Sequence, residues 1–288
     1  MMQPMSTSWR GQQRRRARAR TLFLAAVALV LLVPILWTLL ASFGVTPDNG
    51  TSPPQWSLPP SLAHYAEVGV AEPAYLQELL TSLGLASLAT LLTTVVAFLA
   101  AYSFVRARFV GRRVLVQSFL ILASVPVMAY VIPLNDTMQR LHLTDTFVGV
   151  ALAGTAVYVP LAVYILTGYL GQLAHDVEDA AYLDGAPPLH ILWSIVLPIV
   201  APGVIATACI VFVLNWNLFL IPLVLTLSRI KTIPVAMSDF FTFERELEWP
   251  TAAAALIVSL LPLVLFVALA HRALEQFSLG TTPHEPDR

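Results

Sequence analysis

The chain has 288 residues, of which 57% are hydrophobic and only 11% are charged, and its formal net charge is −1. A typical soluble domain is about 45–50% apolar and about 25% charged, so this composition excludes a soluble globular protein. The single cysteine, Cys209, lies in an apolar run, and the six histidines show no ligand spacing, which excludes a disulfide framework and predicts no metal site. We therefore expect an all-α protein that crosses the membrane several times.

The N-terminal segment, residues 1–20, is basic and precedes the first apolar run, residues 21–43. That run exceeds the roughly 20 residues needed to span a bilayer, and the positive-inside rule keeps the basic segment in the cytoplasm. A cleaved signal peptide is the alternative, but its apolar part is usually about 7–15 residues long. Residues 44–78 are rich in Pro, Ser and acids and are expected to form an external loop. The basic segment contains Arg10, Arg14, Arg15, Arg16, Arg18 and Arg20.

The second and third spans are predicted at residues 79–104 and 114–134, separated by a basic cytoplasmic loop. The third contains Pro126, and a short external loop, residues 135–145, follows it. Small residues in the second span repeat every four positions in two neighbouring columns, which would let helices approach closely in lipid. The columns are Ser82, Ala86, Thr90 and Thr94, and Ala89, Thr93, Ala97 and Ala101.

Three further spans are predicted at residues 146–170, 199–227 and 251–270. The polar stretch 171–198 between the first two carries acids but no Lys or Arg, and the parity of the spans places it in the cytoplasm. Residues 228–250 form an external loop, and 271–288 a cytoplasmic tail. On this model residues 21–270 form one six-helix transmembrane domain, and 12 of the 16 Lys and Arg residues are cytoplasmic, so both termini lie inside.

The stretch from Asp176 to Pro198 is predicted to fold as helix, glycine turn, helix. Gly185 stands where a left-handed residue would end the first helix. Pro187 and Pro188 lack an N–H group, which is harmless in a first helical turn, so a second helix is expected to begin there.

This stretch resembles the EAA loop of binding-protein-dependent ABC importer permeases. Asp179-Ala180-Ala181, Gly185, Ile195 and Leu197-Pro198 match its spacing, with Asp179 in place of the family's Glu. The resemblance implies that this loop docks on an ATPase, with either Glu178 or Asp179 supplying the family's carboxylate contact. It extends to Ala101-Tyr102, Ile132-Pro133-Leu134, Trp216-Asn217 and Leu261-Pro262, as in maltose and trehalose permeases. The implied ATPase-coupling residues are Glu178, Asp179, Ala180, Ala181, Asp184, Gly185, Ile195, Leu197 and Pro198.

The six predicted spans contain no Asp, Glu, Lys or Arg. Proton and ion pathways retain such residues despite their cost, so proton-coupled transport lacks its usual groups. The chain also lacks the GxxxxGK[ST] phosphate loop, and no catalytic constellation is recognisable, so we expect no enzyme activity and no cofactor of its own. ATP would be bound by a partner subunit.

The polar residues that remain in the predicted spans include Asn215, Trp216, Asn217 and Tyr158. An unpaired amide in hydrocarbon costs several kcal/mol, so each asparagine should face protein or a water-filled path. Two residues on a helix are about 200° apart, so the two asparagines face different surroundings. We expect Asn217 on the substrate path and Asn215 in helix packing, with a helix-to-helix hydrogen bond as the alternative for either; Tyr158 is more often a packing residue.

The resemblance implies a permease subunit that imports a sugar or polyol by alternating access across the inner membrane of a prokaryote. Its expected partners are a second homologous permease, an ABC ATPase dimer, an extracytoplasmic binding protein, the carbohydrate and membrane lipid, but no nucleic acid. Importers of glycerol-phosphate-like or peptide substrates, and a non-transporting membrane scaffold or sensor, are the alternatives.

Overall fold

A computed structural model describes residues 8–48, 55–56, 59–68, 73–226, 229–239 and 249–279. The outer parts of the predicted terminal segments, residues 1–7 and 280–288, lie outside the described residues, as do residues 240–248 of the predicted external loop 228–250. The described chain is helical apart from one antiparallel pair of two-residue strands, β1 (Pro47–Asp48) and β2 (Gln55–Trp56). The predicted all-α class is confirmed.

The chain divides into two units, which are described separately. The first unit comprises residues 1–71 and 246–258. It contains α1 (Ser8–Ser42), the strand pair, α2 (Ala63–Ala66) and the beginning of α12 (Trp249–Leu279). Near the end of α1, the hydroxyl groups of Ser42 and Tyr65 lie 2.6 Å apart, and Thr251 Oγ1 donates to Glu67 Oε2 at 2.9 Å. These contacts join α2 to the end of α1 and to the first turn of α12.

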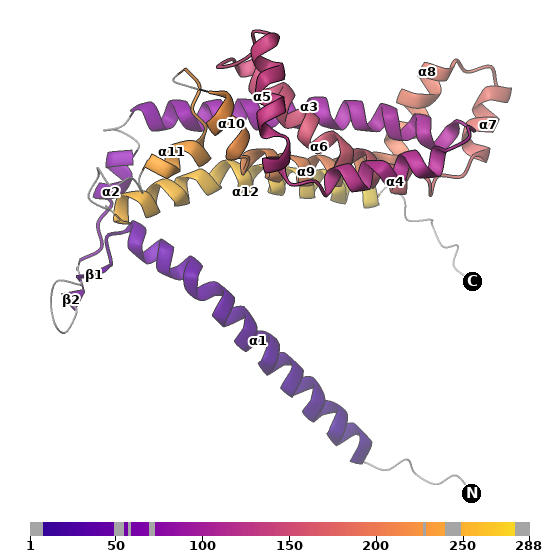
Figure 1. Cartoon of the computed structure of the whole chain (residues 1–288). Coiled ribbons are helices and arrows are strands. Elements are labelled where there is room, and N and C mark those ends of the chain that lie inside the picture. Colours follow the sequence, from indigo (N-terminus) through magenta and orange to yellow (C-terminus); the bar gives the residue numbers. More distant parts are fainter. Residues whose placement is uncertain are drawn as a thin grey trace, which may run out of the picture. The chain divides into compact units, whose positions relative to one another are not determined.

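The second unit is a helix bundle in which α3 (Pro73–Arg106) packs against α6 (Phe147–Leu170) and α9 (Leu197–Trp216) (Figure 1). Helix α3 can pack closely because its small residues form the contact face. Every member of the two predicted columns is buried, which supports their role in helix packing.

Five described helices are long and apolar enough to cross a membrane. They correspond to the predicted first, second, fourth, fifth and sixth spans, and they cover Ala19–Ser42, Ala74–Arg106, Phe147–Leu170, Pro188–Trp216 and Trp249–Glu275. The five match the predicted spans in order, although their ends differ.

The predicted third span, residues 114–134, is not one continuous helix. It is divided between α4 (Arg112–Ala123), the 3-10 turn η2 (Val127–Ala129) and α5 (Val131–Arg140). Pro126 is the cause, because it offers no N–H group and lies in an extended conformation, with φ −60° and ψ 135°. Helix α4 is only about 18 Å long at 1.5 Å per residue, so a sixth span here stays a prediction. Helix α5 also extends into residues 135–140, where a loop was expected.

The helix that corresponds to the predicted fifth span, residues 199–227, begins and ends at other residues than predicted. The helix begins at Pro188 and runs through α8 (Pro188–His190), the π-helix η3 (Ile191–Val196) and α9. It ends at Trp216, and a separate short helix, α10 (Leu220–Leu225), follows. The second helix of the polar loop and the fifth span are therefore one helix, because nothing after Pro188 interrupts its backbone. Helix α11 (Ile233–Asp239) lies in the predicted external loop.

Candidate functional site

The first helix of the polar loop is α7 (Asp176–Leu183), and Gly185 ends it as the sequence predicts. Gly185 has φ +82° and therefore lies in the left-handed region. The N–H group of Ala186 donates to Ala181 O at 3.0 Å, and that of Gly185 donates to Tyr182 O at 3.0 Å. These two bonds form the Schellman pattern, which satisfies carbonyls at the end of the helix. The turn therefore fixes where the chain leaves α7.

The second helix begins at Pro188, directly after Pro187 in an extended conformation with φ −70° and ψ 152°. Pro188 occupies the first helical position, where its missing N–H group costs nothing. The π-helix η3 follows, and of the residues matched by sequence, Ile195 and Leu197 are half-buried while Pro198 is exposed. The loop thus consists of two helices at a fixed turn, the second continuing into α9.

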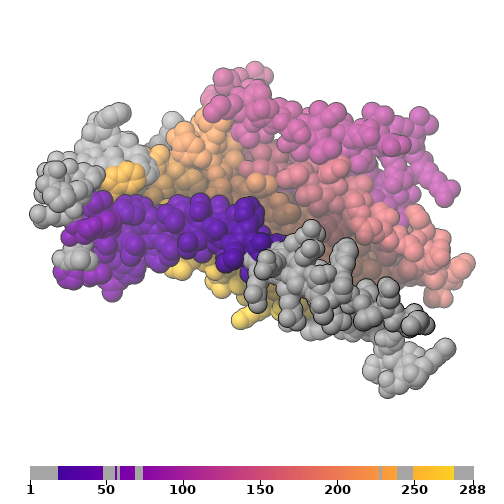
Figure 2. All heavy atoms as spheres, turned by 90° about the horizontal axis from the view of Figure 1, so that it is seen from below, coloured from indigo at the N-terminus to yellow at the C-terminus, as the bar shows by residue number. Residues whose placement is uncertain are grey.

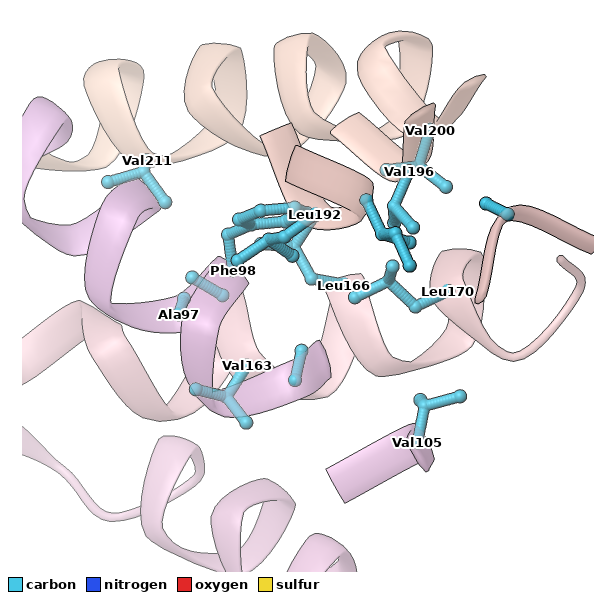
Figure 3. Close-up of a cluster of buried hydrophobic side chains, with 14 residues drawn as sticks. Ala97, Phe98, Val105, Val163, Leu166, Leu170, Leu192, Val196, Val200 and Val211 are labelled. Atoms are coloured by element: carbon cyan, nitrogen blue, oxygen red, sulfur yellow. The ribbon is translucent and has the colours of Figure 1, made fainter. Parts of the chain in front are cut away.

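The inner face of the loop is held by a cluster of buried apolar side chains (Figure 3). Ala181 from α7, Ile191, Leu192 and Val196 from η3 join residues of α3, α6 and α9 in this cluster. Trp193 adds an aromatic contact to α3, with its ring centroid 5.9 Å from that of Phe98. Burial of this apolar surface fastens both loop helices to the end of the bundle.

Glu178 also points inward, with only 4% of its surface exposed. Its carboxylate forms an ion pair with Arg106, whose Nε donates to Oε1 at 2.7 Å. The hydroxyl of Tyr102 donates to Oε2 at 2.8 Å. Asp179, by contrast, is exposed. Of the two carboxylates that the sequence left open, Asp179 is the one at the surface.

The outer face of the loop combines exposed apolar residues with carboxylates. Leu183 is 88% exposed and Leu189 is 70% exposed. We call this face the α7–α8 surface; it consists of Asp176, Asp179, Ala180, Leu183, Asp184, Gly185 and Leu189, all exposed. It lies at the end of the bundle where α3 ends, and its salmon spheres form the surface there in Figure 2. Exposed apolar residues with a polar rim mark a surface for interaction with another protein or with the membrane.

Asn215 and Trp216, near the end of α9, are packed inside the second unit. A Cβ added at Gly154 of α6 would lie 2.6 Å from Asn215 Oδ1, so the amide fills the space that this glycine leaves. Its Nδ2 donates to Val211 O at 3.1 Å. Trp216 stacks on Phe212 with ring centroids 6.0 Å apart. Both residues thus serve helix packing in this structure.

Asn217 is exposed and caps α9 where the helix stops before α10. Its Nδ2 donates to Val213 O at 2.8 Å, and nearby the hydroxyl of Tyr158 donates to Leu214 O at 3.2 Å. The two asparagines therefore face different surroundings, as their spacing predicts. Tyr158, half-buried, links α6 to the last turn of α9.

Tyr102 and Arg106 are the site residues that sequence reasoning missed. Arg106 entered only as part of the basic loop between the second and third predicted spans, and Tyr102 only through the family resemblance. The available signal was the position of Glu178 three residues before Ala181, on the same face of α7. A buried acid needs a charge partner, and the loop itself contains no Lys or Arg. The spacing therefore indicates that a cation from another part of the chain pairs with Glu178.

Comparisons with known proteins agree on one family. Residues 93–277 match the model of the binding-protein-dependent transport system inner membrane component. The trehalose transport system permease protein SugB of Mycobacterium tuberculosis is 34% identical over 197 residues, covering 67% of this chain and 72% of that protein. The trehalose/maltose transport system permease protein MalG of Thermococcus litoralis is 32% identical over 248 residues, covering 84% of this chain and 88% of the other.

The fold is also found among solved structures. A chain of a bacterial ABC transporter involved in the import of the acidic polysaccharide alginate matches with a TM-score of 0.72 at 18% sequence identity. The match covers 94% of this chain and 99% of the other.

Proposed function

Since the chain belongs to the family of binding-protein-dependent transport system inner membrane components, we propose that it is a permease subunit of an ATP-driven sugar importer. It forms half of the path for a sugar or polyol across the inner membrane of a prokaryote, and it works by alternating access. A second permease, an ATPase dimer and an extracytoplasmic binding protein complete the transporter. The named functions of the trehalose and trehalose/maltose relatives support a carbohydrate substrate.

The observation that carries the proposal is the α7–α8 surface. Leu183 and Leu189 project from a loop whose inner face is fixed by the buried cluster, so the loop is rigid and its outer face is free to bind. Asp176, Asp179 and Asp184 give this face a negative charge that suits a basic rim on a partner. The ATPase binds here, on the cytoplasmic side, and both chain termini lie on that side.

Some residues of the loop contact the ATPase, and others hold the loop against the bundle. Asp179, Ala180, Asp184 and Gly185 are exposed and contact the ATPase. Ala181, Ile195 and Leu197 anchor the loop from within, and Pro198 lies at the start of α9. Glu178 supports the loop from its inner side through its contacts with Tyr102 and Arg106 of α3.

The substrate path runs past the break between α9 and α10. Non-helical backbone at membrane depth is tolerated where it is buried in protein or lines a water-filled cavity, and transporters use such breaks at their binding sites. Exposed Asn217 contacts the path, while Tyr158, Asn215 and Trp216 hold the end of α9 in place.

A crosslinking experiment tests the docking surface. Leu183 is suitable for a single cysteine because it is the most exposed large apolar residue of the loop, whereas Ala181 is buried. In a Cys209→Ala background, Leu183→Cys should crosslink to the co-purified ATPase in membranes. A cysteine at the exposed Ile132 of α5 is the control and should not. Labelling of the cysteine at residue 183 from outside the cell would contradict both the docking and the topology.

Transport itself is tested in vesicles with the complex purified through a tag on this chain. Uptake of labelled trehalose or maltose should require both ATP and the binding protein. Uptake of phosphoesters or peptides alone would favour the other importer classes, and an intact complex with no uptake would favour a scaffold or sensor.

A further inference from the structure

The last turn of α3 holds the first turn of α7 through one carboxylate. Tyr102 and Arg106 are four residues apart and therefore lie on the same face of α3. Tyr102 donates to one oxygen of Glu178, and Arg106 Nε donates to the other. Arg106 also contacts Leu173 O at 3.5 Å, just before α7. We call Tyr102, Arg106 and Glu178 the α3–α7 clamp.

Loss of either charge of the clamp is costly, because both charges are largely removed from water. The side chains of Arg106 and Glu178 are 13% and 5% exposed. A charge that stays buried without its partner is strongly destabilising, so replacing either Arg106 or Glu178 would weaken the contact between α3 and α7. Residues 171–198 contain no Lys or Arg that could replace Arg106.

Besides the buried apolar cluster, two features connect the loop to the bundle. The first is covalent, since the chain enters the loop from α6 and leaves it through α8, η3 and α9, which form one helix. The second is the clamp, which reaches α3. Near its opposite end, α3 is tied again, because Glu78 pairs with Lys231 at 3.4 Å and Ser82 Oγ accepts from the N–H group of Ile233 at 2.7 Å. Helix α3 therefore joins the loop to the beginning of α11 and the residues just before it.

We propose that Tyr102 and Arg106 are positioning residues for coupling: acting through Glu178, they make α3 move together with α7 when the ATPase displaces the loop. This rests on the proposed function of the α7–α8 surface. Without the clamp, the ATPase would still bind the exposed face, but α7 would be held to the bundle mainly by the apolar contact of Ala181 in the buried cluster, while the α8–α9 helix would still follow the movement. The helices would then rearrange incompletely, and ATP would be hydrolysed with little transport.

The test uses the whole complex, purified through a tag on this chain and reconstituted in vesicles. Three quantities are measured: ATPase bound per permease, the rate of ATP hydrolysis, and labelled trehalose transported per ATP hydrolysed. Glu178→Gln keeps the shape and removes the charge, and should lower transport per ATP about tenfold, the effect of losing a charged hydrogen bond. Tyr102→Phe should cause a smaller loss in the same direction. Asp136→Asn, which neutralises an exposed acid on α5, is the matched control.

A charge swap separates positioning from folding. Arg106→Glu and Glu178→Arg should each impair coupling, and the double variant should recover at least half of the loss because the pair is restored with opposite sense. Normal transport per ATP in Glu178→Gln would overturn the proposal. The proposal would also be overturned if both single variants lost transport per ATP and the double variant recovered none of it. A lower yield of assembled complex that accounts for the whole loss of transport would overturn it as well. If instead Asp179→Lys binds the ATPase normally, the docking surface itself is wrong, which is a different failure.

Discussion

At the scale of single residues, Glu178 and Asp179 show how adjacent carboxylates acquire different tasks. One is buried against Arg106, and the other is exposed on the same helix turn. Local rules place Gly185 correctly, because a left-handed turn depends only on neighbouring backbone. They cannot orient Glu178, since its partner lies 72 residues earlier in the chain.

Asp179 should determine how well the ATPase binds. Asp179→Lys reverses a charge on the α7–α8 surface, which we propose docks on a basic rim of the ATPase, so affinity for the ATPase should fall about tenfold, as for a charge pair turned repulsive. Affinity can be measured by titrating the ATPase onto the reconstituted permease. Asp136→Lys makes the same charge change on α5 and should leave affinity unchanged. Equal affinity for both variants would contradict the assigned role.

Gly185 can be tested against a glycine with the same backbone conformation. Gly185 and Gly111 have φ +82° and +87°, and a Cβ at either would meet no described atom within 4 Å. Valine at either position should therefore cost about 1–2 kcal/mol of strain without a clash. Only Gly185→Val should weaken ATPase binding, because it alters the direction of the helix at Pro188. If Gly111→Val weakens binding equally, the effect is general destabilisation.

The two asparagines should respond differently to the same substitution. Asn215→Leu removes the amide packed against Gly154 and should lower the yield of assembled complex. Asn217→Leu changes an exposed residue and should leave the yield normal while altering trehalose uptake. Yield is measured by quantitative blotting of membranes, and uptake is then normalised to it. An equal loss of yield in both variants would make Asn217 a packing residue.

At the scale of helices, prolines account for the main departures from the expected spans. Pro126 divides the third apolar run, while Pro188 begins a helix that then continues into the fifth span. Hydropathy identified both runs, because composition decides what can enter lipid. Hydropathy could not locate the ends of these helices, because a helix can begin in a polar segment and continue into the membrane with the same backbone conformation.

The contact between α6 and α9 should not tolerate a larger residue at Gly203. A Cβ there would lie 2.4 Å from the ring of Tyr169 and 2.9 Å from its Cβ, so the helices would have to separate. Gly203→Ala should therefore destabilise the protein by about 1–3 kcal/mol, as overpacking does. Gly168→Ala, one residue from Tyr169 and with no described atom within 4 Å of the added Cβ, should be neutral or stabilising. The two variants are compared by the temperature at which each aggregates in detergent. Equal aggregation temperatures would contradict the close packing of Gly203 on Tyr169.

At the scale of the whole molecule, the middle parts of the long apolar helices carry no charge. Glu78 and Arg106 lie near opposite ends of α3, and no charged residue stands between them. An anionic substrate at the midplane would normally meet a cation or a helix N-terminus, so we expect a neutral one. Neutral disaccharides should compete with labelled trehalose for uptake, and phosphoesters should not. Inhibition by phosphoesters alone would show that a partner subunit supplies a cation.

The π-helical segment Ile191–Val196 gives the transporter a way to be retuned by changing the length of its chain. Its hydrogen bonds span one residue more than those of an α-helix, so deleting one residue would let regular α-helical bonds form. Each α-helical residue turns the chain by about 100°. A single-codon deletion would therefore rotate Leu189 and the face around it relative to α9 without altering any side chain on that face.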